Sequence, residues 1–185
     1  MAVGKNSNMI VGLDIGTSKV VCIVGKYNDE NKLEIVALGA YPSSGLKKGV
    51  VVNIDATTDA ISKAVEQAQS MIEEKIKSVF VGIAGNHIKS LNSQGAVGIK
   101  DKEVTPYDID RVIDSAQAVS IPSDQRVLHV LPQEFVIDGQ EVSLDPLGMS
   151  GVRLEAKVHL VTCANSAIKN IEKCIKNCGL GVDGF

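Results

Sequence analysis

The fold of this chain is decided by the stretch Val11-Gly12-Leu13-Asp14-Ile15-Gly16-Thr17-Ser18-Lys19. One apolar run, Met9 to Leu13, leads into this stretch, and a second, Lys19 to Val24, follows its small-residue turn. Two apolar runs joined by a tight turn are typical of a β-hairpin. A third strand, Leu33 to Tyr41, comes after a polar turn, so an antiparallel meander is predicted.

The turn of this hairpin has the chemistry of an anion-binding loop. Small residues at Gly16, Thr17 and Ser18 allow backbone N–H groups to approach an anion, and both hydroxyls can donate hydrogen bonds. Lys19 adds a positive charge, and Asp14 supplies a carboxylate that can hold a hydrated magnesium ion. These five residues are therefore predicted to bind the phosphates of a cofactor, with Asp14 also serving as the metal ligand; no catalytic residue is predicted.

A plain β-hairpin, with a Gly-Thr turn and a lysine that points to solvent, is the alternative interpretation. The apolar strands on both sides favour phosphate binding. We expect Asp14 to lie at the end of a core strand, where an unpartnered carboxylate is costly.

The region after the meander predicts a helix and a buried strand. Asp55 is a suitable N-cap, and apolar residues follow it at helical spacing. These residues are Ile61, Val65, Ala68 and Ile72. Val79 to Ala84 then reads as a strand that ends at Gly85.

Residues 86–163 predict a strand–helix–strand–strand insertion. Its helix starts at Thr105-Pro106, with an N-cap hydroxyl and a proline at the first helical position. Pro132 interrupts the strand 126–138 and suggests an edge position or a bulge there. After the insertion come a helix from Asn165 to Gly179 and the start of a further strand. The predicted class is α/β (α+β).

Composition excludes several classes of function. Of the 185 residues, 44% are hydrophobic and 22% are charged, which is typical of a globular domain. The net charge is −3 and no basic stretch could neutralise a run of phosphates, so nucleic-acid binding is not expected. No secretory signal, membrane-spanning stretch of roughly 20 apolar residues or disulfide framework is evident, which predicts a reduced, cytoplasmic protein.

Four segments carry a resemblance to a known family. The stretch 11–19 resembles the first phosphate motif of the actin, sugar-kinase and heat-shock-chaperone ATPase superfamily. Residues 42–53, 126–135 and 147–159 are similar to FtsA, the family of bacterial actin-like cell-division proteins. The resemblance covers residues 9 to 185.

The resemblance implies an actin-like ATPase (ribonuclease H-like) fold. Residues 1–85 and 164–185 would then form part of subdomain 1A, and residues 86–163 would form the inserted subdomain 1C, an SHS2 domain. ATP and Mg²⁺ are the implied cofactors, with at most weak ATPase activity in the full-length protein.

The resemblance also implies a place in the cell. FtsA proteins form actin-like filaments on the cytoplasmic face of the inner membrane at the septum. There they tether the FtsZ ring and recruit later division proteins. The implied contacts are self-assembly through 1A and 1C, the FtsN cytoplasmic tail through 1C, FtsZ through a 2B subdomain, and the membrane through a C-terminal helix, the last two outside this chain.

Two other functions share the phosphate motif. A sugar or small-molecule kinase needs an aspartate as general base near the substrate hydroxyl, and no residue here has that context. A pilus-assembly actin homologue would share the architecture, but the segments 42–53 and 147–159 argue against it.

We expect this chain alone not to bind ATP measurably. One phosphate turn, without an opposing loop and an adenine pocket, makes too few contacts to offset the entropic cost of association. Isothermal titration calorimetry checks this expectation, and micromolar ATP binding by the 185-residue chain would contradict it.

Overall fold

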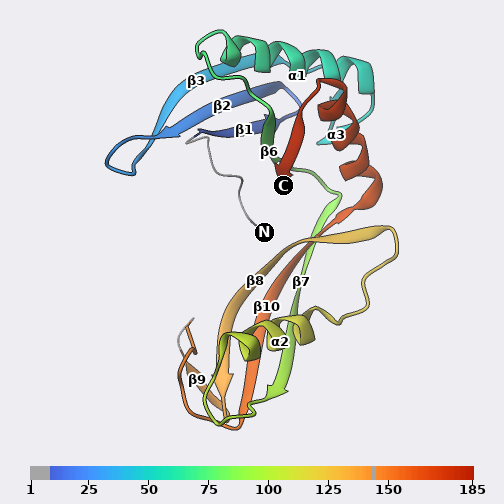
Figure 1. Ribbon diagram of the computed structural model, residues 1–185. Helices are drawn as coiled ribbons and strands as arrows, with labels where there is room; N and C mark the ends of the chain where they lie inside the picture. Colours follow the sequence, from blue (N-terminus) through green and yellow to red (C-terminus); the bar gives the residue numbers. More distant parts are fainter. Residues whose placement is uncertain (1–8, 143–144) are drawn as a thin grey trace. The chain divides into compact units, whose positions relative to one another are not determined.

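A computed structural model describes residues 9–142 and 145–185 (Figure 1). The described residues form two compact units. Unit 1 comprises residues 9–87 and 166–185, and unit 2 comprises residues 88–165 with the gap at 143–144. In the described part of the chain, no helix is both long and apolar enough to cross a membrane.

Unit 1 is built on a five-stranded mixed sheet. Its strands are β1 (Met9–Ile15), β2 (Lys19–Tyr27), β3 (Leu33–Pro42), β6 (Ser78–Gly82) and β11 (Gly181–Gly184). The spatial order is β11-β6-β1-β2-β3. The first three strands form the predicted antiparallel meander, whereas β6 runs parallel to β1 and β11 runs parallel to β6.

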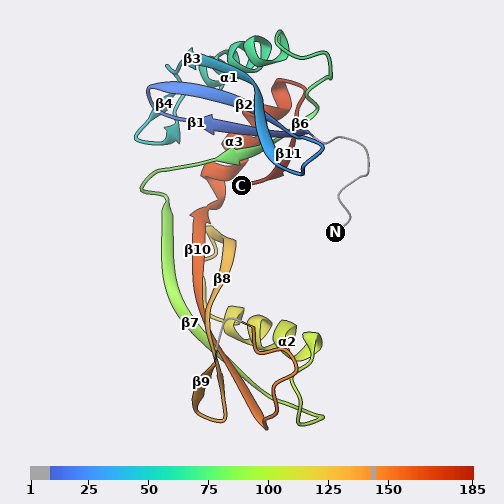
Figure 2. The same cartoon turned by 90° about the vertical axis from the view of Figure 1, so that its left-hand side faces the viewer.

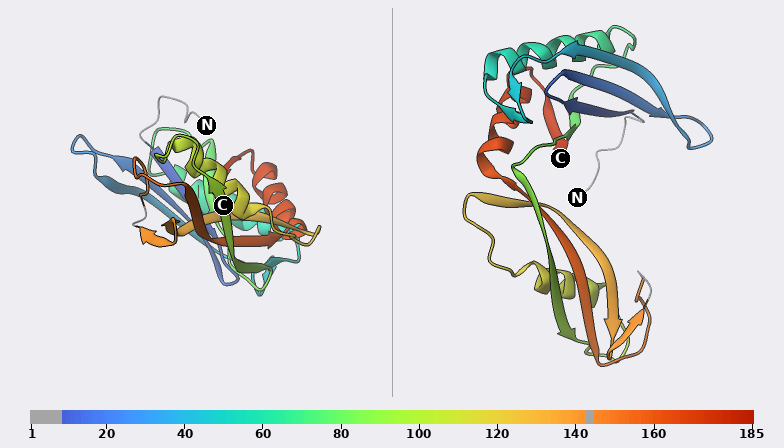
Figure 3. Two further views of the ribbon diagram at one scale, coloured as in Figure 1. Left: turned by 90° about the horizontal axis from the view of Figure 1, so that it is seen from below. Right: turned by 180° about the vertical axis from the view of Figure 1, so that it is seen from behind.

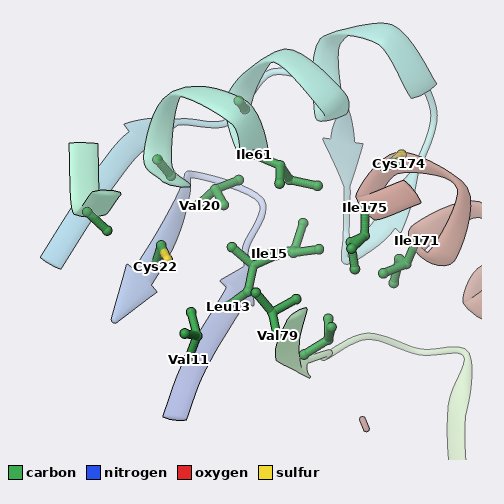
Figure 4. Close-up of a cluster of buried hydrophobic side chains, with 14 of the residues drawn as sticks. Val11, Leu13, Ile15, Val20, Cys22, Ile61, Val79, Ile171, Cys174 and Ile175 are labelled. Atoms are coloured by element: carbon green, nitrogen blue, oxygen red, sulfur yellow. The ribbon is translucent and has the colours of Figure 1, made fainter. Parts of the chain in front are cut away.

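Two helices, α1 (Ile54–Gln69) and α3 (Asn165–Asn177), cover one face of this sheet (Figure 3). Both helices contribute to one hydrophobic cluster with the inward-facing strand residues. Figure 4 shows the side chains of that cluster converging between the sheet and the helices: Val11, Leu13, Ile15, Val20, Cys22, Ile61, Val79, Ile171, Cys174 and Ile175. Burial of this apolar surface is the main stabilising contribution in unit 1.

The start of α1 differs from the prediction. Asn53, not Asp55, is the N-cap: its side-chain oxygen accepts a hydrogen bond from the Ala56 N–H at 3.0 Å. Asp55 lies in the first turn, where a negative charge is favoured by the helix dipole. The segment before α1 contains a short hairpin, made of β4 (Leu46–Lys47) and β5 (Val50–Val51), that the sequence patterns did not predict.

Unit 2 is a four-stranded antiparallel sheet with one helix packed on it (Figure 2). Its elements are β7 (Ile88–Gly98), α2 (Pro106–Gln117), β8 (Gln125–Ile137), β9 (Gln140–Val142) and β10 (Arg153–Ala164). The spatial order is β7-β10-β8-β9. The strand–helix–strand–strand order was predicted, whereas the short strand β9 was not. Together the two sheets confirm the predicted fold class.

The irregularity at Pro132 is confirmed. The register between β10 and β8 shifts from Lys157 opposite Glu134 to Val158 opposite Pro132, which is a β-bulge. Proline has no N–H to donate to a neighbouring strand. On the β9 side this costs no hydrogen bond, because residue 132 lies outside the part of β8 that pairs with β9.

The N-terminus of α2 is closed by a reciprocal capping box. Thr105 is the N-cap and Pro106 the first helical residue, as predicted. The Asp108 carboxylate accepts hydrogen bonds from the Thr105 hydroxyl at 2.6 Å and the Thr105 N–H at 3.2 Å, and it forms an ion pair with Arg111 at 3.1 Å. The hydrogen bond from the Thr105 hydroxyl is the largest cause that holds the pKa of Asp108 below its ordinary value. The Thr105 N–H bond and the nearby Arg111 charge lower it further.

We expect Asp108→Ala to lower the free energy of unfolding by about 1 kcal/mol at neutral pH, because it removes half of the capping box. A carboxyl whose pKa is depressed in the folded state contributes stability above its unfolded pKa and loses it as pH falls through the folded pKa. The difference between wild type and variant should therefore be constant from pH 7 to about pH 5 and shrink below about pH 4. Urea denaturation at several pH values measures it.

The exposed neighbour Asp110 provides the control, since Asp110→Ala leaves the box intact. An equal, pH-independent loss in both variants would contradict the role given to Asp108.

Candidate phosphate-binding turn

Asp14 lies on the open face of the unit 1 sheet. Val11, Leu13 and Ile15 are buried under the helices, so the alternation of β1 turns Gly12 and Asp14 to the opposite side. Asp14 lies near the end of a core strand, as expected, but its carboxylate is exposed. An exposed carboxylate keeps its hydration, so the cost of burying Asp14 is no argument for a function. The geometry around Asp14 is the evidence that remains.

The surroundings of Asp14 leave its carboxylate accessible. Asp14 pairs with Gly82 of the parallel strand β6, and a Cβ on Gly82 would lie 3.5 Å from the Asp14 Oδ1 atom. Next to it, a shallow groove of about 480 Å³ runs over Gly12, between the side chains of Ile23 and Phe80. Gly12 on β1 and Gly82 on β6 thus leave the sheet surface open beside the Asp14 carboxylate. From the sequence alone Gly82 was assigned only to a strand, so its place beside Asp14 was missed.

The turn between β1 and β2 is closed by its own backbone. The Gly16 N–H donates to the Lys19 carbonyl at 3.1 Å, so this N–H is already used. Thr17 and Ser18 form the exposed tip of the turn. Lys19 precedes the buried Val20, so strand alternation places its side chain on the same open face as Asp14. The structure therefore brings Asp14, Thr17, Ser18 and Lys19 together at one end of the sheet.

The hairpin of β4 and β5 holds the turn in place. Its tip has a left-handed backbone at Lys48 (φ 51°) and Gly49 (φ 78°), which is typical of a tight two-residue hairpin. The Gly49 N–H donates to the Thr17 Oγ1 atom at 3.1 Å, and the Ser43 N–H donates to the Ser18 carbonyl at 3.0 Å. This support was missed at the sequence level, although Lys48-Gly49 is a recognisable turn signal.

The support has a chemical consequence. A hydroxyl that accepts one hydrogen bond keeps its proton free to donate elsewhere. Thr17 Oγ1 accepts a hydrogen bond from the Gly49 N–H, so its proton is available to an anion at the tip, and Lys19 adds positive charge to this end of the sheet. Lys48, at the tip of the supporting hairpin, is exposed and adds positive charge to this end of the unit. The residues present thus fit a phosphate group, and the Asp14 carboxylate fits a hydrated magnesium ion bound next to it.

The cysteines of α3 have a structural role. Cys174 is buried in the unit 1 core and Cys178 packs against it, so both belong to the packing of the helix on the sheet. Burial raises the pKa of both thiols above its ordinary value, and it raises the pKa of the Cys22 thiol to about 11. Over the described residues, no three His, Cys, Asp or Glu side chains are grouped so as to hold a metal ion.

His159 points away from the buried face of β10, and its Nδ1 atom lies 2.6 Å from the Asn92 Oδ1 atom.

Comparison with known proteins identifies relatives of both units. Residues 85–162 match the family described as "SHS2 domain inserted in FTSA". The cell division protein FtsA of Pseudomonas aeruginosa is 62% identical over 183 residues, which is 99% of this chain and 44% of that protein. FtsA of Neisseria meningitidis is 54% identical (92% and 41%), and FtsA of Escherichia coli K12 is 41% identical (99% and 44%). The chain thus spans less than half the length of these curated relatives.

Among solved structures, the chain resembles a chain of the PilM-PilN type IV pilus biogenesis complex. The TM-score is 0.64 at 14% sequence identity, over 94% of this chain and 46% of that one. At this identity the likeness establishes an actin-like fold and carries no function.

Gly49→Ala should destabilise unit 1 by roughly 3 kcal/mol or more. The new Cβ would lie 1.9 Å from the Ala84 carbonyl oxygen, and the positive φ adds strain of roughly 1–2 kcal/mol. Gly179→Ala is the matched control in the same unit: its φ is 73°, but nothing lies within 4 Å of the new Cβ, so only the φ strain applies. Urea denaturation of both variants checks the difference, and equal losses would contradict the packing of the hairpin tip.

Proposed function

The chain belongs to the FtsA family of cell-division proteins, and from this premise we propose that it supplies one side of an ATP site and a protein-contact domain to an actin-like division scaffold. The observation that carries this proposal is that the similarity to FtsA proteins runs through both units and includes the turn from Asp14 to Lys19. A kinase function lacks any comparable support in the chain.

The proposed cofactors are ATP and Mg²⁺. The backbone N–H groups and hydroxyls of Thr17 and Ser18, together with the Lys19 ammonium, would hold phosphate oxygens, and Asp14 would hold the hydrated metal through water or directly. Gly16 contributes by closing the turn through its bond to the Lys19 carbonyl, and its lack of a side chain keeps that turn compact. Bound magnesium would neutralise phosphate charge, and any ATPase activity of the complete protein is proposed to be weak.

The two sequence regions take different parts in this scaffold. We assign residues 1–85 and 164–185 to part of subdomain 1A, which carries the phosphate turn, and residues 86–163 to subdomain 1C. The proposed partners are further copies of the protein through 1A and 1C, and the FtsN cytoplasmic tail through 1C. Contact with the FtsZ ring and with the inner membrane is assigned to a 2B subdomain and a C-terminal helix, beyond these 185 residues.

The test is a chimera in cells. The matching region of P. aeruginosa FtsA is replaced by this chain, and the chimera is expressed in cells depleted of their own FtsA. We expect division to continue, with the chimera located at the septum on the cytoplasmic side of the membrane. Stable expression without division, seen as long undivided cells, would overturn the proposal.

The cofactor role is tested in the same chimera. Asp14→Asn should weaken Mg²⁺-dependent ATP binding about tenfold or more and impair division, because a neutral amide replaces the proposed metal ligand. Asp29→Asn, in the exposed turn after β2, is the matched control and should behave as wild type. Equal ATP binding by the two purified chimeras would refute the role of Asp14 without touching the proposed scaffold function.

A further inference from the structure

β7 is a long edge strand with one partner. It runs for 11 residues at the end of the unit 2 sheet, and among the described residues its one pairing partner is β10 (Figure 2). An edge strand of this length presents a row of backbone groups to which another strand can bind.

The register shows which residues present those groups. The Ile99 N–H donates to the Val152 carbonyl at 2.8 Å, in line with the pairing of Val97 and Leu154, so the odd-numbered residues of β7 face β10. The even-numbered residues then direct their N–H and C=O groups away from the sheet. These residues are Ser90, Asn92, Gln94 and Ala96, all exposed. In the described part of the chain, no other strand pairs with them.

The C-terminal end of β7 differs from its middle. At Gly98 the outward carbonyl accepts a hydrogen bond from the Arg111 Nη1 atom at 3.2 Å, which closes the edge there. The span 90–96 has no such cap among the described hydrogen bonds.

The other edges of the two main sheets are blocked in part. In β3 the Gln67 side chain of α1 accepts the Ala40 N–H at 3.0 Å, and Pro42 ends the strand. β9 and β11 are short and carry Glu141 and Asp183. Short strands, charges, proline and side-chain caps are the usual means by which proteins block edge pairing. β7 has none of these between residues 90 and 96.

Charge supports pairing with an identical strand. The four outward-facing residues are uncharged, so two copies of this edge can approach without repulsion. On the sheet face that α2 leaves uncovered, the charged side chains of the neighbouring strand β10 form ion pairs within the sheet. These pairs are Lys157 with Glu134, and Arg153 with Glu155 at 3.0 Å. Glu155 also accepts a hydrogen bond from the Gln94 amide at 2.8 Å. No net charge of one sign therefore faces the edge to select an oppositely charged ligand.

We propose that β7 pairs with β7 of a second copy of this chain, antiparallel about a twofold axis near Ser93. In this register Asn92 lies opposite Gln94 of the second copy, and Ser90 lies opposite Ala96. All four residues then exchange backbone hydrogen bonds with the partner strand, and the two sheets become one continuous sheet. Such an isologous contact is self-complementary and closes at a dimer. The inference deepens the proposed self-assembly by naming a contact in unit 2.

The contact is small. One added strand pair buries much less than the roughly 1,200 Å² of a stable specific interface. The dimer should therefore be weak and populated only at high protein concentration, or where the protein is concentrated on a surface.

Sedimentation velocity of the 185-residue chain over a wide concentration range tests the proposal. We expect a reversible monomer–dimer equilibrium. Gln94→Lys should weaken it about tenfold or more, because the twofold axis brings both lysines into the pairing region. Gln133→Lys, an exposed glutamine on β8 away from the edge, should leave dimerisation unchanged. Far-UV circular dichroism and melting temperatures verify that both variants fold.

A third variant tests whether the chain associates through a different surface, the open face of unit 1. Phe80→Lys places a charge on the apolar open face of unit 1. A dimer lost in Phe80→Lys but retained in Gln94→Lys overturns pairing through β7, while self-assembly as such stands. A wild-type chain that stays monomeric at every concentration also overturns the pairing; the proposed scaffold function is tested independently by the chimera.

Discussion

The alternation of β1 under the two helices is the constraint on which unit 1 depends. Because α1 and α3 lie on the same face of the sheet, one set of β1 side chains is buried and the other set, including Asp14, faces the opposite side. A shift of one residue would bury the carboxylate and expose Leu13, at a cost in both desolvation and lost apolar burial. Core packing thus determines where the candidate metal ligand points.

The candidate phosphate-binding turn depends on contacts between segments that are distant in sequence. Gly49 reaches the Thr17 hydroxyl, and Gly82 leaves space beside Asp14. Gly49 in turn packs directly against the Ala84 carbonyl, which ties the hairpin tip to the segment after β6. The turn is therefore a rigid part of the unit and not an isolated loop, which suits a site that must hold donors in place before an anion arrives.

Unit 2 follows the same plan on a smaller scale. α2 packs so closely on β7 that a Cβ at Gly95 would lie 2.4 Å from the backbone of α2. The buried face of the sheet is apolar, whereas charged residues on the other face are paired across strands. Stability comes from the covered face, and the polar face and the β7 edge remain accessible for protein contacts.

The sequence by itself determined the elements whose signals are local. The meander, the α2 cap at Thr105, the bulge at Pro132 and the clustering of small residues after Asp14 all follow from period, turn chemistry and proline geometry. Only the tertiary structure decided that Asp14 is exposed, that Asn53 caps α1, that the Gly16 N–H is already bonded and that Gly49 supports Thr17. The physical reason is that the burial of a side chain depends on which sheet face the helices cover, and its hydrogen-bond partners depend on which distant segments lie next to it. A local sequence pattern contains neither kind of information.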